Sequence, residues 1–204
     1  MMTQTLNTTE QQIIAAARKI FMHRGLAGAR MQDIADEAGI NKAMLHYYYR
    51  SKEKLFEIVF GEAIDQLLIK VNNVLAEKMP VEQKLATVVD YYITNLSENP
   101  YLPMFVLNEI QQNPDRMVQR FMHAPLFPNI QVFIGEIGTA MENGTFRKVN
   151  PAQLMVSIIS MCIFPFVARP LLQAAFTVND MQFGMMMQER KKFVTDFVMH
   201  ALRP

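Results

Sequence analysis

The segment from residue 31 to residue 54 reads MQDIADEAGINKAMLHYYYRSKEK, and it constrains the fold more than any other part of the chain. Ile34 and Ala38 recur at helical spacing, so they can belong to one apolar stripe. Gly39 can then take the positive φ that ends a helix, and Asn41 is a suitable N-cap for the next one. The pattern predicts two short helices joined by a glycine turn, which is a helix-turn-helix.

The second of these helices divides its side chains between two faces. Met44, Leu45 and Tyr48 are expected to face inward. The side chains expected on the outer face are those of Lys42, Ala43, His46 and Tyr47. A helix-turn-helix needs this division because its second helix lies in the major groove, where some residues meet base edges and others hold phosphates. The segment therefore predicts double-stranded DNA as a partner.

Three runs of residues follow one another in register around this motif. They read Asp33-Ile-Ala-x-x-Ala-Gly-Ile-Asn-Lys, Leu45-His-Tyr-Tyr-Tyr and Ser51-Lys-Glu-Lys-Leu. Together they resemble the signature of the TetR family, the tetracycline-repressor-like bacterial regulators, and the resemblance extends from about Thr9 to Phe56. In that family a further helix precedes the motif. Residues 9–23 match that expectation with an apolar stripe, and Gly25 can end the helix.

Two positions depart from the family pattern. Arg30 stands where members commonly carry Thr or Ser just before the first motif helix, so its side chain has no oxygen with which to cap. His46 stands where the family often has Tyr, so a common phosphate contact is replaced by a shorter, titratable side chain. His46 could donate to phosphate or base, and a merely exposed role is an equal alternative.

The resemblance implies a set of DNA-facing positions. Tyr47 and Lys52 are expected to hold phosphates. Gln32, Lys42 and Ala43 are expected to face the bases. The full candidate set is Arg30, Gln32, Asn41, Lys42, Ala43, His46, Tyr47, Tyr48 and Lys52. Charge supports this modestly: residues 1–55 hold eight Lys and Arg against five Asp and Glu, which is +3, and since the whole chain is +1 the remainder is −2.

Beyond the motif the sequence stays helical in character, with no strand alternation of useful length. Helices are expected over residues 53–78, 81–97, 101–113, a broken stretch 114–123, 128–143, 151–176 with kinks at Pro165 and Pro170, and 181–202. The fold class is therefore all-α. We expect a three-helix DNA-binding domain over residues 1–55, followed by a helical ligand-binding and dimerisation domain over residues 56–204.

The resemblance implies that this second domain binds a small-molecule effector. Eleven of the 17 methionines lie beyond residue 100, and thioether side chains suit either a pocket for flexible apolar ligands or a plain core. Apolar and polar side chains mix between residues 101 and 120, which favours a pocket there. The candidate lining is Met104, Phe105, Asn108, Glu109, Gln112, Phe127, Phe133, Met161 and Phe164. Each polar member could instead belong to a solvated helix face.

The family also implies a homodimer built from the last two long helices. The residues proposed for that interface are Leu154, Ile158, Phe193, Phe197 and Val198. Two copies would place two recognition helices on a palindromic operator. The alternative for these side chains is an ordinary core within one chain.

Other classes of function are poorly supported. Gly135-Glu-Ile-Gly138 lacks the strand and third glycine of a dinucleotide fingerprint, and the four histidines share no ligand-spaced motif with Cys162. We therefore expect no cofactor, no metal and no enzymatic activity. The sequence shows no export signal and no unbroken apolar stretch of membrane length, and it contains a single cysteine. These features predict a cytoplasmic protein. The alternatives are a regulator with a protein effector or none, and a helical carrier or enzyme with a vestigial DNA motif.

Overall fold

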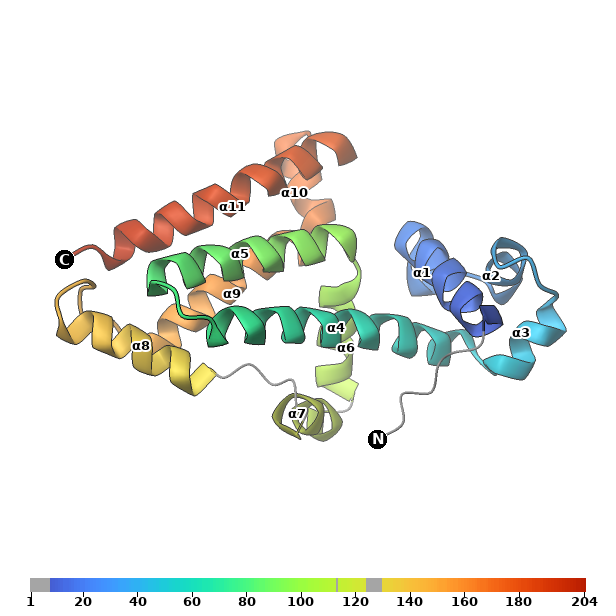
Figure 1. Cartoon of the computed structure of the whole chain (residues 1–204). Helices are drawn as coiled ribbons and strands as arrows, with labels where there is room; N and C mark the ends of the chain where they lie inside the picture. The colour runs from blue at the N-terminus through green and yellow to red at the C-terminus, as the bar shows by residue number, and fades with distance from the viewer. Residues whose placement is uncertain (1–7, 113, 124–129) are drawn as a thin grey trace. The chain divides into compact units, whose positions relative to one another are not determined.

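The computed structural model describes residues 8–112, 114–123 and 130–204, and within these ranges every regular element is an α-helix (Figure 1). The predicted all-α fold is thereby confirmed. The chain divides into two compact units, Met1–Ile64 and Asp65–Pro204. Helix α4, Lys52–Ala76, is continuous across this division, so it begins in the first unit and ends in the second.

The first unit is built around the aromatic side chains of its longest helices. Its helices are α1 (Thr8–Gly28), α2 (Met31–Glu37), α3 (Lys42–Tyr48) and the first half of α4. Phe21 of α1 is fully buried, and its ring meets that of Phe56 of α4 edge-on, with centroids 4.9 Å apart. Phe56 in turn packs on Phe60 at 4.2 Å. This apolar contact fixes α4 to the helix that precedes the motif.

Two glycines in the first unit take the left-handed backbone conformation. Gly39 has φ 68° and closes the turn between α2 and α3, as predicted. Gly25 has φ 64° and ψ 179°, so its backbone is not helical, and two helical segments meet there at a kink within α1. The longer segment, which precedes the motif, ends at Gly25 as expected, and a short segment continues to Gly28, with the amide of Ala29 donating to the Gly25 carbonyl at 3.2 Å.

The second unit packs its helices around α5. Its elements are the second half of α4, then α5 (Val81–Glu98), α6 (Leu102–Gln112), α7 (Pro114–His123), α8 (Ile130–Glu142), α9 (Pro151–Val167), α10 (Arg169–Phe176) and α11 (Asp180–Leu202). Helix α5 lies against α8, α9 and α11 (Figure 1). Lys191 of α11 pairs with Asp90 of α5 at 3.0 Å. Leu85, Val89 and Ile93 form part of the core on the buried side of α5.

The predicted helix over residues 151–176 is two helices in the structure. Pro165 lies inside α9, whereas Pro170 stands in the first turn of α10, where a proline fits without a kink. The break falls at Ala168, and the two helices are bent by 74°. In the described ranges no single helix is both long and apolar enough to cross a membrane, although this bent pair meets the criteria of length and composition when taken together.

Arg190 of α11 compensates for the proline inside α9. Pro165 has no N–H, so it cannot donate to the carbonyl of Met161 four residues earlier. The Nε of Arg190 donates to that oxygen at 2.8 Å. Cys162 beside it is fully buried, and burial raises the pKa of its thiol to about 12. The thiol is therefore protonated at neutral pH, which agrees with an inert core residue.

Arg190→Ala is expected to lower the free energy of unfolding by about 1–2 kcal/mol, because it leaves the Met161 carbonyl without its donor. Adding Pro165→Ala should recover part of this loss, since the new amide can donate to the same oxygen. Urea unfolding of both single variants and the double variant measures the coupling. Strict additivity of the two changes would show that Arg190 and Pro165 act independently.

Candidate functional site

The recognition helix α3 is fixed at its start and anchored at its middle. The side chain of Asn41 accepts from the backbone amide of Met44 at 2.7 Å, so Asn41 is the N-cap, as predicted. Leu45 is fully buried and Tyr47 is 84% exposed, which gives the helix its inner and outer faces. Its outer residues Lys42, Ala43 and His46 are exposed.

The inner face differs in part from the prediction. Met44 is 40% exposed and Tyr48 is only partly buried, whereas Tyr49 at the end of the helix is 8% exposed. Seven residues make barely two turns, and Leu45 is the one residue of α3 that is buried. Tyr49, just beyond the helix, has an extended backbone and is buried as well. Burial, with smaller contributions from Glu10 and Glu62, raises the pKa of the Tyr49 phenol.

Cations on the first unit fall into two groups. One group is paired: Lys19 with Glu37, Arg24 with Asp33, Arg18 with Glu62, and Lys54 with Glu57. The cations of the other group form no ion pair with a described carboxylate. They are Arg30, Lys42, Arg50 and Lys52. The second group stands at the starts of α2, α3 and α4 and in the turn before α4. Cations without a described acidic partner at these positions favour a positive surface around the motif.

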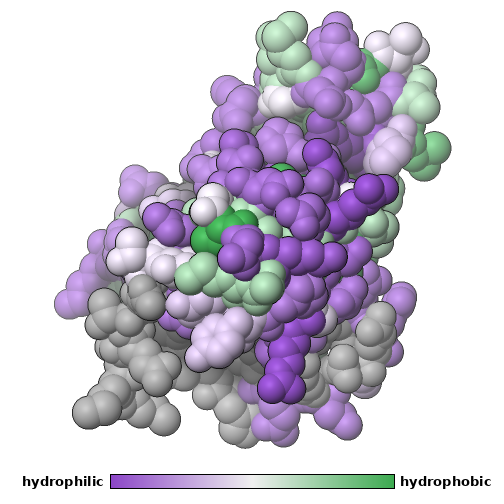
Figure 2. All heavy atoms as spheres, turned by 90° about the vertical axis from the view of Figure 1, so that its right-hand side faces the viewer, coloured by the Kyte–Doolittle hydropathy of each residue, from purple (hydrophilic) through white to green (hydrophobic). Residues whose placement is uncertain are grey.

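Two of the candidate DNA contacts have local features of their own. Gln32 donates from Nε2 to Asp36 at 2.7 Å, so its amide is held along α2 while its Oε1 remains an acceptor. Arg30 occupies the N-cap position of α2 without a side-chain hydrogen bond to the helix. Its guanidinium is therefore not committed to the cap. Figure 2, in which the right-hand side of Figure 1 faces the viewer, shows mostly hydrophilic side chains among those it colours.

The described residues among those predicted to bind an effector differ widely in exposure. Phe133 and Phe105 are core side chains at 0% and 7% exposure, whereas Met104 is 43% exposed and Asn108 is also exposed. Phe164 is 58% exposed on α9. Glu109 and Gln112 lie in α6, their side chains are outside the described set, and Phe127 lies outside the described residues.

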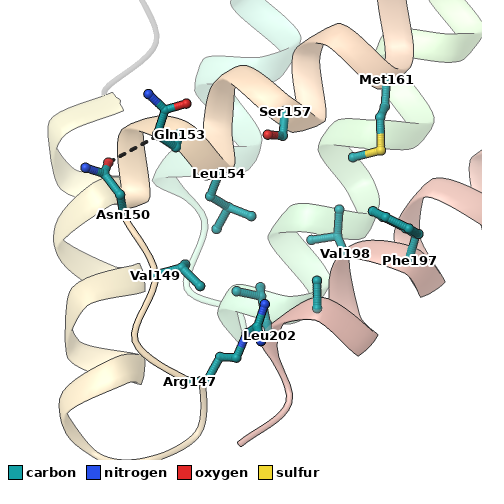
Figure 3. Close-up of a pocket in the computed structure, with 11 residues that line it drawn as sticks. Arg147, Val149, Asn150, Gln153, Leu154, Ser157, Met161, Phe197, Val198 and Leu202 are labelled. Atoms are coloured by element: carbon teal, nitrogen blue, oxygen red, sulfur yellow. Dashed lines mark hydrogen bonds between the residues drawn. The ribbon is translucent and has the colours of Figure 1, made fainter.

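A cavity of about 240 Å³ opens between α9 and α11, close to Leu202 at the end of α11 (Figure 3). Phe197 and Val198 of α11 face Leu154 and Met161 of α9 across it. Met161, predicted as an effector residue, therefore lines this groove between the two helices. Arg147 stands at its margin, and its backbone amide donates to the Leu202 carbonyl at 2.9 Å.

The residues predicted for a dimer interface separate into two groups. Phe193 and Phe197 are 61% and 56% exposed. Ile158 and Val198 are 1% and 3% exposed, so their side chains belong to the core of the single chain and have almost no surface left for a partner. Leu154 is half-buried and lines the groove. This corrects the placement of Ile158 and Val198, because α5 already covers that side of α9 and α11.

Comparison with known families agrees with the motif and extends beyond it. Residues 13–59 match the family described as bacterial regulatory proteins, tetR family. Residues 80–198 match the tetracyclin repressor-like C-terminal domain. The chain belongs to the TetR family. It is a DNA-binding transcriptional regulator, and the matched family and named relatives are regulators rather than enzymes.

Individual relatives span most of the chain. The HTH-type transcriptional repressor NicS of Pseudomonas putida is 27% identical over 98% of this chain and 95% of its own length. The fatty acid metabolism regulator protein of Bacillus subtilis is 26% identical over 67% of this chain and 70% of its own length.

Solved structures of similar proteins support the fold. A regulator of the TetR/AcrR family from Thermobifida fusca has a TM-score of 0.71 and 17% identity, covering 97% of this chain and 100% of its own. The regulator FadR from Bacillus subtilis, solved with stearoyl-CoA, has a TM-score of 0.63 and 17% identity, covering 95% and 100%. At these identities the likeness establishes the fold alone.

Arg50 is not among the DNA contacts predicted from the sequence, although the structure places it beside them. It stands between the end of α3 and the start of α4, among the cations without a described acidic partner. The charge count included Arg50, but a count cannot tell a paired cation from an unpaired one. The pairing depends on which helices approach each other, and that is a property of the fold.

Proposed function

We propose that this TetR-family chain is a homodimeric repressor that leaves a palindromic operator when a small, largely apolar effector binds. The observation that carries the DNA-binding part is the arrangement around α3. A capped recognition helix with an exposed outer face is flanked by Arg30, Lys42, Arg50 and Lys52, whose charges have no described acidic partner. Such cations neutralise phosphates and release counterions, which supplies affinity.

Lys52→Ala is expected to weaken binding to all duplexes alike and to flatten the salt dependence by about one unit of slope, because one phosphate contact is lost. Fluorescence anisotropy at several salt concentrations, on duplexes selected from a random library by the wild-type protein, measures both effects. Lys54→Ala is the matched control, since Lys54 is paired with Glu57 at 3.2 Å. An unchanged slope for Lys52→Ala would remove it from the interface.

Gln32→Ala should act differently. If Gln32 reads a base, its loss relaxes preference at particular base pairs, and each lost contact costs about 1–3 kcal/mol. Asp36 holds the Gln32 amide from the same helix, so Asp36→Ala should change the same base preference more weakly. Binding to single-base operator variants distinguishes the roles. If Gln32→Ala weakened binding equally for all operator variants, Gln32 would help to position the protein on DNA without reading a base.

Two similar proteins support the proposal that this chain is a repressor and that it binds an apolar effector. NicS is named as a repressor, and the FadR structure holds stearoyl-CoA. The abundance of methionine beyond residue 100 suits a flexible apolar ligand. We propose movement of α4 as the link, because α4 begins in the DNA-binding unit and ends in the second unit. Such movement would alter the separation of recognition helices, which must match major-groove faces about 34–36 Å apart or a multiple of that.

Titrating the protein–operator complex with stearoyl-CoA tests this proposal, with stearate and CoA alone as separate probes. Release by the acyl compounds but not by CoA supports an apolar effector. If CoA without an acyl chain released the protein from DNA, the effector site would recognise the nucleotide part of the ligand. Operator binding that none of the three changes would favour the alternative of a protein effector or none.

A further inference from the structure

The last turn of α4 contains a carbonyl group that its own helix does not satisfy. Leu75 is one of the last residues of α4, and the amide of Met79, four residues on, donates to the carbonyl of Glu77 instead, at 3.2 Å. The ammonium of Lys84, near the start of α5, donates to the Leu75 carbonyl at 2.8 Å. A cation at the C-terminal end of a helix also complements the helix dipole.

The same ammonium group ties the end of α4 to a third helix, α8 (Figure 1). It donates to both carboxylate oxygens of Glu136, at 2.7 and 2.8 Å. Lys84 is buried, whereas Glu136 is 37% exposed and lines a cleft of about 410 Å³ with Val81 and Thr139. Water therefore screens the carboxylate, while the bond to α4 is buried. We call Lys84, Glu136 and the Leu75 carbonyl the α4 anchor.

Apolar contacts also hold the second half of α4 in place. Leu67, Val71 and Val74 are buried, and the Lys70 ammonium lies over the ring of Tyr91 of α5, 5.8 Å from its centroid. Hydrophobic burial is non-directional, so it holds a helix against its neighbours without fixing a small tilt. A hydrogen bond depends on both distance and angle. The α4 anchor therefore adds a directional contact at the very end of the helix.

A small tilt at this end of α4 becomes a large displacement at the other end. An α-helix rises about 1.5 Å per residue, so Lys52 at the start of α4 lies about 35 Å along the helix from Leu75. A tilt of about 5° on a rod of this length moves its far end by about 3 Å. The rise of one base pair is about 3.4 Å. A change this small at the α4 anchor therefore matters on the scale of an operator.

We propose that Lys84 is a positioning residue for operator recognition: it fixes the end of α4 and so sets which separation of two half-sites the protein accepts. The inference rests on the proposed homodimer and its palindromic operator. Lys84 is a buried residue of the second unit, so it acts through α4 and not by contact with DNA. Discrimination between operator spacings is thereby assigned to a residue outside the helix-turn-helix.

Lys84→Met in the full-length protein tests this role, because methionine keeps the buried stem of the side chain and removes its donors. One duplex is the operator that the wild-type protein selects from a random library. The other has one base pair inserted between the half-sites, which moves them apart by about 3.4 Å and turns them by about 35°. Fluorescence anisotropy gives both dissociation constants. We expect their ratio, at least about 30-fold for the wild type, to fall at least about fivefold in the variant.

The ratio separates positioning from a loss of stability. A smaller folded fraction weakens binding to both duplexes alike and leaves the ratio unchanged, and circular dichroism with thermal unfolding checks folding directly. Glu136→Gln should lower the ratio less than Lys84→Met, because the bond from Lys84 to Leu75 remains. Lys191→Met is the matched control: Lys191 pairs with Asp90 at 3.0 Å and joins α11 to α5 without α4, so its ratio should equal that of the wild type.

The possible results distinguish this inference from the proposed function. If the wild type discriminates between the two duplexes and Lys84→Met and Glu136→Gln discriminate equally well, the role of the α4 anchor is overturned and the proposed homodimer stands. An equal fall in the ratio for Lys191→Met would also overturn it, because any broken contact between helices would then suffice. A wild-type protein that binds both duplexes equally would overturn the proposal of two recognition helices at a fixed spacing, and the α4 anchor with it.

Discussion

Phe197→Glu is expected to give a monomer that no longer binds its operator at physiological salt. Phe197 is 56% exposed in the single chain and borders the groove between α9 and α11. In the proposed homodimer the substitution places a carboxylate and its copy in or near a desolvated interface, at a cost of several kcal/mol. One recognition helix makes few base contacts, so useful affinity requires two copies fixed at the operator spacing.

Sedimentation and operator binding must be measured on the same preparations. Val118→Glu is the control for adding a carboxylate at an exposed apolar position, because Val118 is 55% exposed on α7. A Phe197→Glu protein that stays dimeric would move the interface elsewhere on the chain. A wild-type protein that is monomeric at micromolar concentration, yet binds a palindromic duplex tightly, would defeat the model of DNA binding by a preformed dimer.

The DNA-binding unit could be predicted closely because its determinants are local. Gly39 and Asn41 specify a turn and a cap through the chemistry of single residues, and the structure has both. The limits of the helices in the second unit also lie close to the expected ones, since Pro80, Pro151 and Asn179 mark their starts. Such signals act over a few residues and need no knowledge of the rest of the fold.

The surfaces of the second unit could not be predicted in the same way. Periodicity groups side chains on a face, but it does not say which neighbour covers that face. Val198 and Phe197 are adjacent in sequence, yet one is 3% and the other 56% exposed. The difference arises because α5 packs on one side of α11, which is a contact between distant parts of the chain. The same reason places Phe133 in the core and leaves Phe164 outside.

Lys84 illustrates the largest gap between sequence and structure. A lysine in an amphipathic helix is ordinarily solvated, yet Lys84 is 2% exposed. Its ammonium donates to both carboxylate oxygens of Glu136 on α8, at 2.7 and 2.8 Å. It also donates to the carbonyl of Leu75 at 2.8 Å, in the last turn of α4. One buried cation therefore joins three helices.

Glu136→Ala is expected to lower the free energy of unfolding by about 2–3 kcal/mol, because the Lys84 ammonium then lacks its counter-charge in a buried site. The value lies below the range for fully buried pairs, since the Glu136 side chain is 37% exposed and water screens part of its charge. Lys84→Met should cost less, as it keeps the buried aliphatic stem. Adding Lys84→Met to Glu136→Ala should recover part of the loss.

Urea unfolding with unchanged m-values measures these differences. Asp196→Ala is the control: its exposed pair with Lys192 in α11 should contribute no more than about 0.5 kcal/mol. Because the Lys84 ammonium satisfies a carbonyl at the end of α4, Lys84→Met should also increase hydrogen exchange in the last turn of that helix. A Glu136→Ala variant as stable as the control would show that the Leu75 carbonyl and water suffice for the buried charge.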